Sequence, residues 1–416
     1  MKFDRKFVSI LVLVVIAVAV VAAGCGGTTT TTAAQTTTTA GGGGETTTTA
    51  GGGGAAIEVK VGAIGPFTGQ LSKIGLDALN AQQMAVDEFN AAQDKVKVTK
   101  IEVGDDAADP AKSAAVAEKF VADTAIMGVI GPMTSAGIQA ALPVLEKGNL
   151  AMITQSGTND ALSQGGFKVF HRICPVDAAQ GGAVAGIIAD DLKAKKVYIV
   201  DDKGTYGQGL ADQVEKTLKD KYQITDIQRA QITPEDKDFN ALITKVKAYG
   251  PDVFFAAIPS PAQFATIAKQ MQAQGYTVQL VGADGVKDKG EFIDNAGGAT
   301  EGCYFTSLGP LVEESDDPVA QEFVKKYIEK YQVLSMFSAQ SYEAMNVLLD
   351  AIHRAYDANG GQVTREGVME ALKTTKYTGV LGLEITFTEQ GDLNTSGVFI
   401  GQVKDGKFIQ IKEAQY

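Results

Sequence analysis

From Ile57 onward, short runs rich in valine and isoleucine alternate with longer runs of helical periodicity. The short runs, which we expect to be strands, span residues 58–64, 96–103, 127–130, 150–154, 196–200, 253–258 and 279–282. The longer runs, which we expect to be helices, span residues 75–92, 110–123, 136–145, 178–193, 207–222, 261–274 and 338–356. Continuous apolar runs are typical of buried parallel strands. This alternation predicts an α/β fold whose parallel sheets have helices on both faces.

The length of this body predicts more than one sheet. A body of about 360 residues is too long for one such sheet, so we expect two lobes, each with its own core. Ligands of open α/β sheets bind beyond the carboxyl ends of the strands. The residues that follow four predicted strands, 131–137, 155–160, 201–207 and 283–285, are rich in glycine and hydroxyl groups. Any binding site should therefore be built from these four loops.

The first 25 residues differ from the body. Three basic residues within the first six precede an apolar run from Phe7 to Val21, and small residues then lead to Cys25. The apolar run is short for a membrane span, which needs about 20 residues. The order of these regions is that of a secretory leader. A cysteine directly after small residues resembles the bacterial lipoprotein signal, so we expect a leader at 1–24 and a lipid on Cys25. A plain signal peptide with an incidental cysteine is the alternative.

The segment from residue 25 to residue 56 is predicted to be a flexible tether. "TTTTAGGGG" occurs in it twice, at 36–44 and 46–54, and Glu45 is its only charged residue. Such a composition cannot bury a core. A chain of this kind has an r.m.s. reach of about 30 Å. We expect it to link a lipid anchor to the folded body.

Charge and motif content exclude several classes of function. The net charge is −12, and no long lysine or arginine cluster provides a footprint for nucleic acid. The two histidines, His171 and His353, have no cysteine or carboxylate partners at metal-binding spacing. Neither a G-x-S-x-G nor a G-x-x-x-x-G-K-[ST] motif occurs. We therefore expect no catalysis, no metal and no cofactor.

The loops suit the two charged ends of an α-amino acid. Ser135 and Thr158 each precede a predicted helix beside a glycine, and helix N-termini with hydroxyl groups bind carboxylates. Asp284, between Ala283 and Gly285, is the candidate partner of the ammonium group. The alternatives are that both hydroxyl residues only cap their helices and that Asp284 is an ordinary turn residue. Tyr206 is either a wall of the side-chain pocket or an ordinary half-buried tyrosine.

Two cysteines remain in the body, Cys174 and Cys303. Outside the cytoplasm they could be oxidised. The residues alone leave open whether they form a disulfide or remain two buried thiols.

Nearly the whole body, residues 57–411, resembles the periplasmic leucine/isoleucine/valine-binding proteins, the type I solute receptors of amino-acid ABC importers. Nine stretches in order carry the resemblance: "KVGAIGPFTGQLSKIG" (60–75), "DDAADP" (105–110), "VIGPMTSAG" (129–137), "MITQSGTNDAL" (152–162), "DDKGTYGQGLAD" (201–212), "KDFNALITKVKAYGPDVFF" (237–255), "GADGV" (282–286), "GGATEG" (297–302) and "ITFTEQGDL" (385–393).

The resemblance implies two Rossmann-like lobes with a ligand cleft between them. Three crossover strands would join the lobes near residues 173–176, 303–307 and 395–398. The first lobe would comprise residues 57–174 with 306–395, and the second residues 175–305 with 396–416. Cys174 and Cys303 would then lie beside neighbouring crossovers, and we expect them to be close enough to bond.

The resemblance also implies the roles of the loop residues. Hydroxyl residues of the first lobe would hold the α-carboxylate and part of the ammonium group: Ser135, Ser156 and Thr158. Asp284 matches the acidic partner of the ammonium group, and Tyr206 would close over the ligand from the second lobe.

Two further positions, Ile74 and Phe337, match residues that line the apolar pocket. Ile74 stands where a tryptophan is common, which alters the predicted pocket size. Residues 258–261 replace a tyrosine-containing stretch that contacts the ligand in relatives, so this wall of the pocket is left open.

These features predict an extracytoplasmic, lipid-anchored substrate-binding protein of an ABC importer. It would be a monomer that closes on a branched-chain or similar apolar L-amino acid and then docks on a membrane permease. One alternative is a receptor for another small solute, such as an amide, urea or an aromatic acid. Another is a ligand-sensing ectodomain, which is usually followed by a membrane span and a signalling module; neither is present before Tyr416.

Overall fold

The computed structural model describes residues 56–395 and 397–415. The predicted leader at 1–24, the predicted lipid site Cys25 and, except for Ala56, the predicted tether at 25–56 lie outside these residues. Within the described part of the chain, every helix is too short or too polar to cross a membrane.

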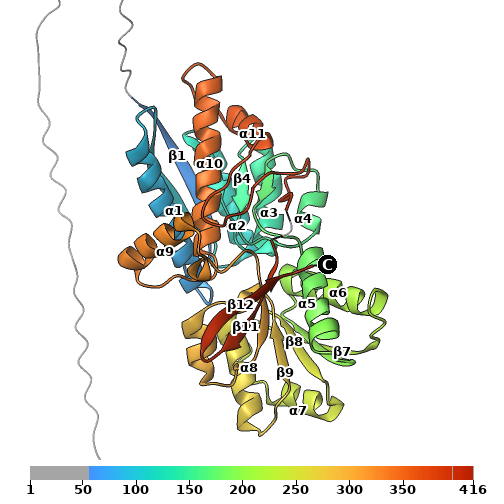
Figure 1. Cartoon of the computed structure of the whole chain (residues 1–416). Helices are drawn as coiled ribbons and strands as arrows, with labels where there is room; N and C mark the ends of the chain where they lie inside the picture. Colours follow the sequence, from blue (N-terminus) through green and yellow to red (C-terminus); the bar gives the residue numbers. More distant parts are fainter. Residues whose placement is uncertain (1–55, 396, 416) are drawn as a thin grey trace, which may run out of the picture. The chain divides into compact units, whose positions relative to one another are not determined.

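The first sheet is wholly parallel and belongs to the first lobe (Figure 1). Its five strands lie in the order β2-β1-β3-β4-β5. The strands are β1 (Ile57–Gly65), β2 (Val96–Asp105), β3 (Ile126–Ile130), β4 (Met152–Thr154) and β5 (Phe170–Arg172). The helices of this lobe are α1 (Ser72–Ala92), α2 (Pro110–Ala122), α3 (Ser135–Lys147), α4 (Ala161–Gln164), α9 (Pro318–Tyr331), α10 (Ser338–Ala358) and α11 (Arg365–Lys373).

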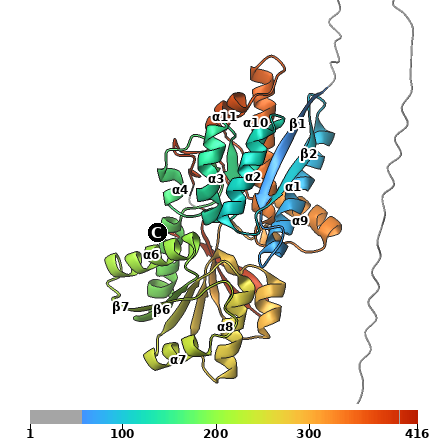
Figure 2. The ribbon, with the colours of Figure 1, turned by 180° about the vertical axis from the view of Figure 1, so that it is seen from behind.

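Helices cover both faces of this sheet. The helices α1 and α10 pack side by side on one face, and α2 and α3 pack side by side on the other (Figures 1 and 2). Each face therefore has its own apolar cluster, one centred on α1 and α10 and one on α2 and α3. The predicted α/β architecture is confirmed for this lobe.

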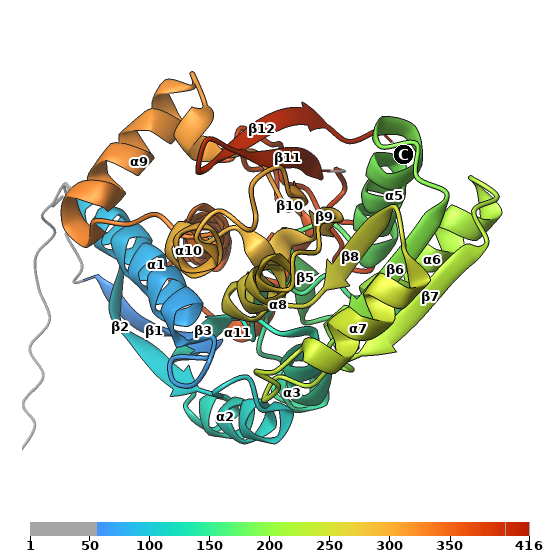
Figure 3. The same cartoon turned by 90° about the horizontal axis from the view of Figure 1, so that it is seen from below.

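The second sheet contains seven strands in the order β12-β11-β10-β9-β8-β6-β7. Its strands are β6 (Lys196–Asp201), β7 (Asp226–Gln231), β8 (Val253–Ala257), β9 (Gln279–Gly282), β10 (Tyr304–Ser307), β11 (Phe399–Lys404) and β12 (Lys407–Glu413). The strands β6 to β10 pair in parallel, whereas β11 and β12 form an antiparallel hairpin at one edge. Its helices are α5 (Asp177–Gly186), α6 (Thr205–Asp220), α7 (Asn240–Tyr249) and α8 (Pro261–Ala273), which surround the sheet in Figure 3.

The strand β6 shows why both faces of this sheet are covered. Side chains of a strand point alternately to opposite faces. Val197 and Ile199 pack in the cluster that contains α5 and α6, whereas Tyr198 and Val200 pack in the cluster that contains α7 and α8. An uninterrupted apolar run thus serves two layers of helices, as the sequence pattern predicts.

The chain passes between the two lobes three times: between β5 and α5, between β10 and α9, and before β11. The prediction that all three connections are strands is wrong for the described residues. Residues 173–174 form a bend, and residues 175–176 and 397–398 are irregular. Only the second connection contains a strand, β10, which belongs wholly to the second sheet. The predicted boundary between residues 305 and 306 falls inside this strand, and the other predicted lobe limits stay a prediction.

Candidate ligand-binding site

A cleft of about 560 Å³ lies at the carboxyl ends of the parallel strands and is lined by both lobes. The first lobe contributes residues that follow β1, β3 and β4, and the second lobe contributes residues that follow β6, β8 and β9. Six of the seven residues predicted to bind the ligand line this cleft: Ile74, Ser135, Ser156, Tyr206, Asp284 and Phe337. The structure therefore brings together loops that lie far apart in the sequence.

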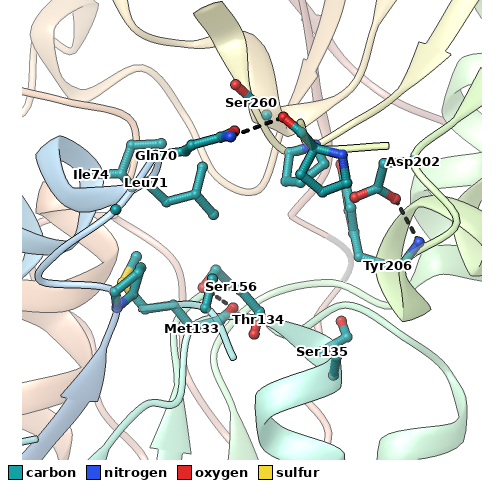
Figure 4. Close-up of a pocket in the computed structure, with 18 of the residues that line it drawn as sticks. Gln70, Leu71, Ile74, Met133, Thr134, Ser135, Ser156, Asp202, Tyr206 and Ser260 are labelled. Carbon is teal, nitrogen blue, oxygen red and sulfur yellow. Dashed lines mark hydrogen bonds between the residues drawn. The ribbon is translucent and has the colours of Figure 1, made fainter. Parts of the chain in front are cut away.

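Ser135 offers a free hydroxyl group to the cleft. Thr134 is the N-cap of α3, because its Oγ1 accepts a hydrogen bond from the Gly137 amide at 3.2 Å. Ser135 is thus the first residue of the helix, and its Oγ has no hydrogen-bond partner among the described residues although the residue is only 1% exposed. Figure 4 shows this hydroxyl directed into the open space. The alternative that Ser135 only caps its helix is wrong.

Ser156 joins two strand ends. Its hydroxyl group donates to the carbonyl of Met133 at 2.8 Å, which ties the loop after β4 to the loop after β3 (Figure 4). The amides of Ser156 and Gly157 both donate to Thr154 Oγ1. The predicted cradle loop is therefore already ordered by its own small polar side chains.

Thr158 is the predicted ligand-binding residue that does not line the cleft. It is completely buried, and it does not cap α4, which begins at Ala161 after Asp160. Its hydroxyl lies beside the carboxyl group of Asp177, but neither group forms a well-aligned hydrogen bond with a described residue. Thr158 thus sits directly behind the cradle.

Asp284 is a buried acid at the opposite wall. The residue is 6% exposed, and its Oδ1 accepts hydrogen bonds from the Tyr206 hydroxyl and from Gln180 Nε2, each at 2.6 Å. Burial raises the pKa of Asp284, although both hydrogen bonds oppose the shift. Burial and the neighbouring Asp284 raise the pKa of Tyr206 well above its usual range. The tyrosine therefore acts as a hydrogen-bond donor that holds the acid in place.

Asp177 and Gln180, two further polar residues behind the cleft, were missed by the sequence reasoning. Asp177 begins α5 and is completely buried, and both of its carboxyl oxygens lack partners among the described residues. Burial raises the pKa of Asp177 to about 8, with contributions from Asp160 and Asp284. Gln180, one turn later, bridges Asp284 and Thr306. Both residues lie just after the first connection between the lobes, and this position in the sequence could have indicated that they lie near the cleft.

An apolar region completes the first-lobe wall. Ile74 and Phe337 line it as predicted, together with Leu71 and Met133. Figure 4 shows Leu71 projecting into the space opposite Tyr206. These residues belong to one apolar cluster beside the cleft. The side-chain end of a ligand would meet hydrocarbon on this wall.

The structure shows which of residues 258–261 form a wall of the cleft, which the sequence did not predict. Pro259 and Ser260 line the cleft, and the Ser260 hydroxyl caps α8 by accepting from the Gln263 amide. Gln263 is held by the carbonyls of Thr233 and Asp236. This wall therefore presents a proline ring and a serine whose hydroxyl already has a partner.

Several hydrogen bonds span the two lobes around the cleft. Gln70 Nε2 donates to the carbonyl of Pro234 at 2.9 Å, and Asn159 Nδ2 donates to the carbonyl of Thr205 at 2.9 Å. Lys73 of α1 pairs with Asp288 of the second lobe. The lobes are in contact on more than one side of the cleft in this structure.

The predicted disulfide is wrong in this structure, where Cys174 and Cys303 are both free and buried. Cys174 packs in the cluster beside the cleft with Leu308 and Met336. Cys303 lies one residue before β10, inside the core of the second lobe. The strand β10 runs away from Cys303 towards Leu308, which explains why two cysteines beside neighbouring connections do not meet. No group of three metal-binding side chains occurs in residues 56–395 and 397–415.

Comparison with known proteins agrees with this geometry. Residues 58–407 match the family described as periplasmic binding protein. The chain is 30% identical over 356 residues to the Leu/Ile/Val-binding protein BraC3 of Rhizobium johnstonii, which covers 85% of this chain and 94% of that protein. It is 31% identical over 345 residues to the leucine-, isoleucine-, valine-, threonine- and alanine-binding protein of Pseudomonas aeruginosa, covering 82% and 88% of the two chains.

The fold is likewise similar to a solved structure. The leucine binding protein LivK from Thermotoga maritima matches with a TM-score of 0.76 and 28% identity, over 85% of this chain and 98% of that one. The predicted fold class, two Rossmann-like lobes of the type I periplasmic binding protein, is thereby confirmed. The chain therefore belongs to the periplasmic binding protein family, within the group of leucine/isoleucine/valine-binding proteins.

Proposed function

We propose that this protein binds an L-amino acid with a branched apolar side chain and delivers it to an ABC importer. One observation carries the proposal: the same cleft has on one lobe the Ser135 hydroxyl, which has no partner among the described residues, and on the other lobe a buried acid, Asp284. These groups complement the two ends of a zwitterion. The names of the relatives support the same ligand class.

The carboxylate end belongs to the first lobe. The first amides of α3 and the Ser135 hydroxyl face the cleft, and a helix N-terminus favours negative charge. Ser156 lies beside them, and its hydroxyl would have to exchange its bond to the Met133 carbonyl for one to the carboxylate, because it has a single proton to donate. These neutral donors can bind the ligand carboxylate without a positively charged side chain.

The ammonium end belongs to the second lobe. Asp284 has one oxygen, Oδ1, engaged by Tyr206 and Gln180, which leaves Oδ2 for the ligand. Asp177 lies close enough to Asp284 for the two acids to influence each other. An ammonium ion at Asp284 relieves the unfavourable burial of that carboxyl group directly, and that of Asp177 at longer range.

Binding would proceed by closure of the lobes. The ligand must interact better with the closed arrangement than with the open one, because only differential affinity shifts a conformational equilibrium. The two walls satisfy this condition, since each lobe supplies one end of the recognition. Charged hydrogen bonds contribute about 1.5–3 kcal/mol each, so several suffice for a micromolar Kd.

The proposed setting is outside the cytoplasm. The leader at 1–24, a lipid on Cys25 and the tether at 25–56 would hold a monomeric body at the membrane surface, where it would meet its permease. The family assignment supports this location.

A thermal-shift screen of the proteinogenic L-amino acids, small amides, urea and aromatic acids tests the proposal. We expect leucine, isoleucine or valine to give the largest rise in Tm, because ligand that binds only the folded state stabilises it. A screen in which only an amide, urea or an aromatic acid raises Tm would contradict the proposal.

A further inference from the structure

The guanidinium group of Arg172 is buried behind the cradle loop. Arg172 is the last residue of β5, and its side chain is completely inaccessible to solvent. Its Nη1 donates to the carbonyls of Gly157 and Asn159, both at 2.9 Å. Its Nη2 donates to Ser163 Oγ at 3.0 Å, and its Nε donates to Asp392 Oδ1 at 2.6 Å. The Arg172 side chain thus binds the carbonyls of both residues that flank Thr158.

Three consecutive carbonyls of the cradle loop are engaged from behind. Arg172 binds those of Gly157 and Asn159, and the Asp177 amide donates to the carbonyl of Thr158 at 2.8 Å. In a trans peptide the N–H points opposite to the carbonyl of the preceding residue. The Thr158 N–H therefore points away from Arg172, and it donates to no other described residue. Ser156 of the same loop lines the cleft.

Asp392 joins this arrangement to the third connection between the lobes. It lies in a turn closed by pairing of Phe387 with Leu393, just before the chain returns to the second lobe. The Gly391 carbonyl accepts from the Arg172 amide at 2.9 Å. Gly391 has a φ of +80°, and a Cβ there would meet the Phe170 carbonyl oxygen at 1.9 Å. The turn is therefore packed closely against β5.

We propose that Arg172 and Asp392 are positioning residues, which fix the backbone of the cradle loop that follows Ser156 and tie this loop to the connections between the lobes. This inference rests on the proposed function, because it requires that the carboxylate of the amino acid binds the first-lobe wall to which the cradle loop contributes Ser156. Arg172 acts only through the loop that it holds. Its planar fork contacts two carbonyls, one hydroxyl and one carboxylate from three separate nitrogens, whereas a lysine has three donors on a single nitrogen.

Arg365 provides a matched control in the same lobe. Its guanidinium also binds backbone carbonyls, including those of Ile126 at 2.9 Å and Asp123 at 2.7 Å. It begins α11 and does not line the cleft. Arg172→Lys and Arg365→Lys therefore both remove carbonyl contacts of a partly or fully buried arginine, but only the first loosens the cradle.

The experiment measures the Kd for leucine by calorimetry, the free energy of unfolding by urea titration, and amide hydrogen exchange of residues 155–160. We expect Arg172→Lys to raise Kd about tenfold or more, as expected for loss of one charged hydrogen bond. It should also speed exchange in the cradle. Arg365→Lys should lower stability and leave Kd and cradle exchange unchanged. Asp392→Asn, at a partly exposed position, should raise Kd by a smaller factor. This variant tests the proposal if Arg172→Lys does not fold.

The outcomes separate the two proposals. Wild-type protein that binds leucine, with Arg172→Lys and Asp392→Asn binding equally well and showing wild-type cradle exchange, would overturn the positioning role alone. If the wild type binds another amino acid in the thermal-shift screen, that amino acid is the probe. A wild type that binds no amino acid would overturn the proposed function, and the positioning role with it.

Discussion

The two walls of the cleft differ in the charge of the polar groups that they bury. On the first lobe, neutral groups hold one another: Ser156 binds the Met133 carbonyl, and Thr134 caps α3. On the second lobe, Asp284 is a buried acid whose pKa is raised by burial. Asp177, behind the same wall, is an acid without a well-formed partner among residues 56–395 and 397–415.

This difference assigns different tasks to the walls. The first wall is an ordered surface that presents hydrogen bonds and hydrocarbon. The second wall buries carboxyl groups that are unfavourable without a nearby cation. The second wall should therefore contribute most of the specificity for a ligand with an ammonium group. Replacement of an acid in this wall by a neutral residue should weaken ligand binding. The same replacement should stabilise the ligand-free protein.

The largest effect is expected from Asp284→Asn. Asparagine can still accept from Tyr206 and Gln180, but it removes the charge opposite the ammonium group. The Kd for leucine should rise about 100-fold, near the upper limit for one charged hydrogen bond. Titration calorimetry measures this change. Asp201→Asn is the control, because Asp201 is equally buried in the second lobe but pairs with Arg229 and does not line the cleft. Equal losses for both variants would contradict the assigned role.

The next effect concerns Asp177 and pH. Its folded pKa, raised to about 8 by burial, exceeds the unfolded value of about 3.9. The unfolded chain therefore binds fewer protons between these values, and the ligand-free protein loses stability as pH rises from 4 to 8. Asp177→Asn should remove this loss and raise the free energy of unfolding at pH 8 by ~1–3 kcal/mol, with little change near pH 4. Urea titrations at both pH values measure it.

The same group should make binding depend on pH. An ammonium ion favours the ionised form of Asp177, so leucine affinity should rise between pH 6 and pH 8, by up to about tenfold per pH unit. Asp177→Asn should flatten this dependence. A wild-type affinity that is constant across this range would show that Asp177 does not sense the ligand.

A moderate effect is expected from Ser135→Ala on the first wall. Its hydroxyl has no hydrogen-bond partner in the described part of the chain, so its removal should leave the free energy of unfolding nearly unchanged. The Kd should rise about tenfold because one hydrogen bond to a charged group is lost. Thr134→Ala is the contrasting variant. It removes the cap of α3 and should lower stability by ~1 kcal/mol.

A smaller effect is expected at the apolar part of the same wall. Ile74 packs beside the cleft with Met133 and Phe337. Ile74→Ala should enlarge the pocket and weaken leucine binding about five-fold, which corresponds to about 1 kcal/mol, the lower end of the value of a methylene contact in such pockets. Phenylalanine should lose less affinity than leucine. Calorimetry with both amino acids checks this, and an equal loss for both would mean that Ile74 does not face the side chain.

The smallest effect concerns the cysteines. Because both are free and buried, a reducing agent should change neither Tm nor Kd. Burial also raises the pKa of Cys174 to about 12, so it should not react with thiol reagents in the folded protein. A count of reactive thiols in denatured, unreduced protein should find both Cys174 and Cys303. Absence of both would establish the disulfide that the structure lacks.

The sequence predicted the fold well wherever strands are buried on both faces, because β6 and β8 contain continuous apolar runs, at residues 197–200 and 253–257. It failed at the edge of the second sheet. The strand β7 alternates exposed and half-buried residues and has no apolar run. The hairpin of β11 and β12 turns at Asp405 and Gly406, both with positive φ, and this Asp-Gly pair was an unused hairpin signal.

The site was predictable where residues follow strands directly. Ser135 and Asp284 were found in this way. The roles of Asp177 and Arg172 depend on contacts between segments distant in the sequence, such as that of Arg172 with Asp392. Hydrophobic periodicity carries no information about such contacts. For the same reason, the sequence did not show that β10 separates Cys303 from Cys174, and the disulfide was predicted from their positions along the chain alone.

Calorimetric titration with L-leucine, L-leucinamide and 4-methylpentanoate tests the account most directly. The amide lacks the carboxylate that the first wall should bind, and the acid lacks the ammonium group that the second wall should bind. We expect tight binding of leucine alone, with both analogues weaker by about 100-fold or more. Binding of 4-methylpentanoate as tight as that of leucine would contradict the account, because the acid at the second wall would then have no part in recognition.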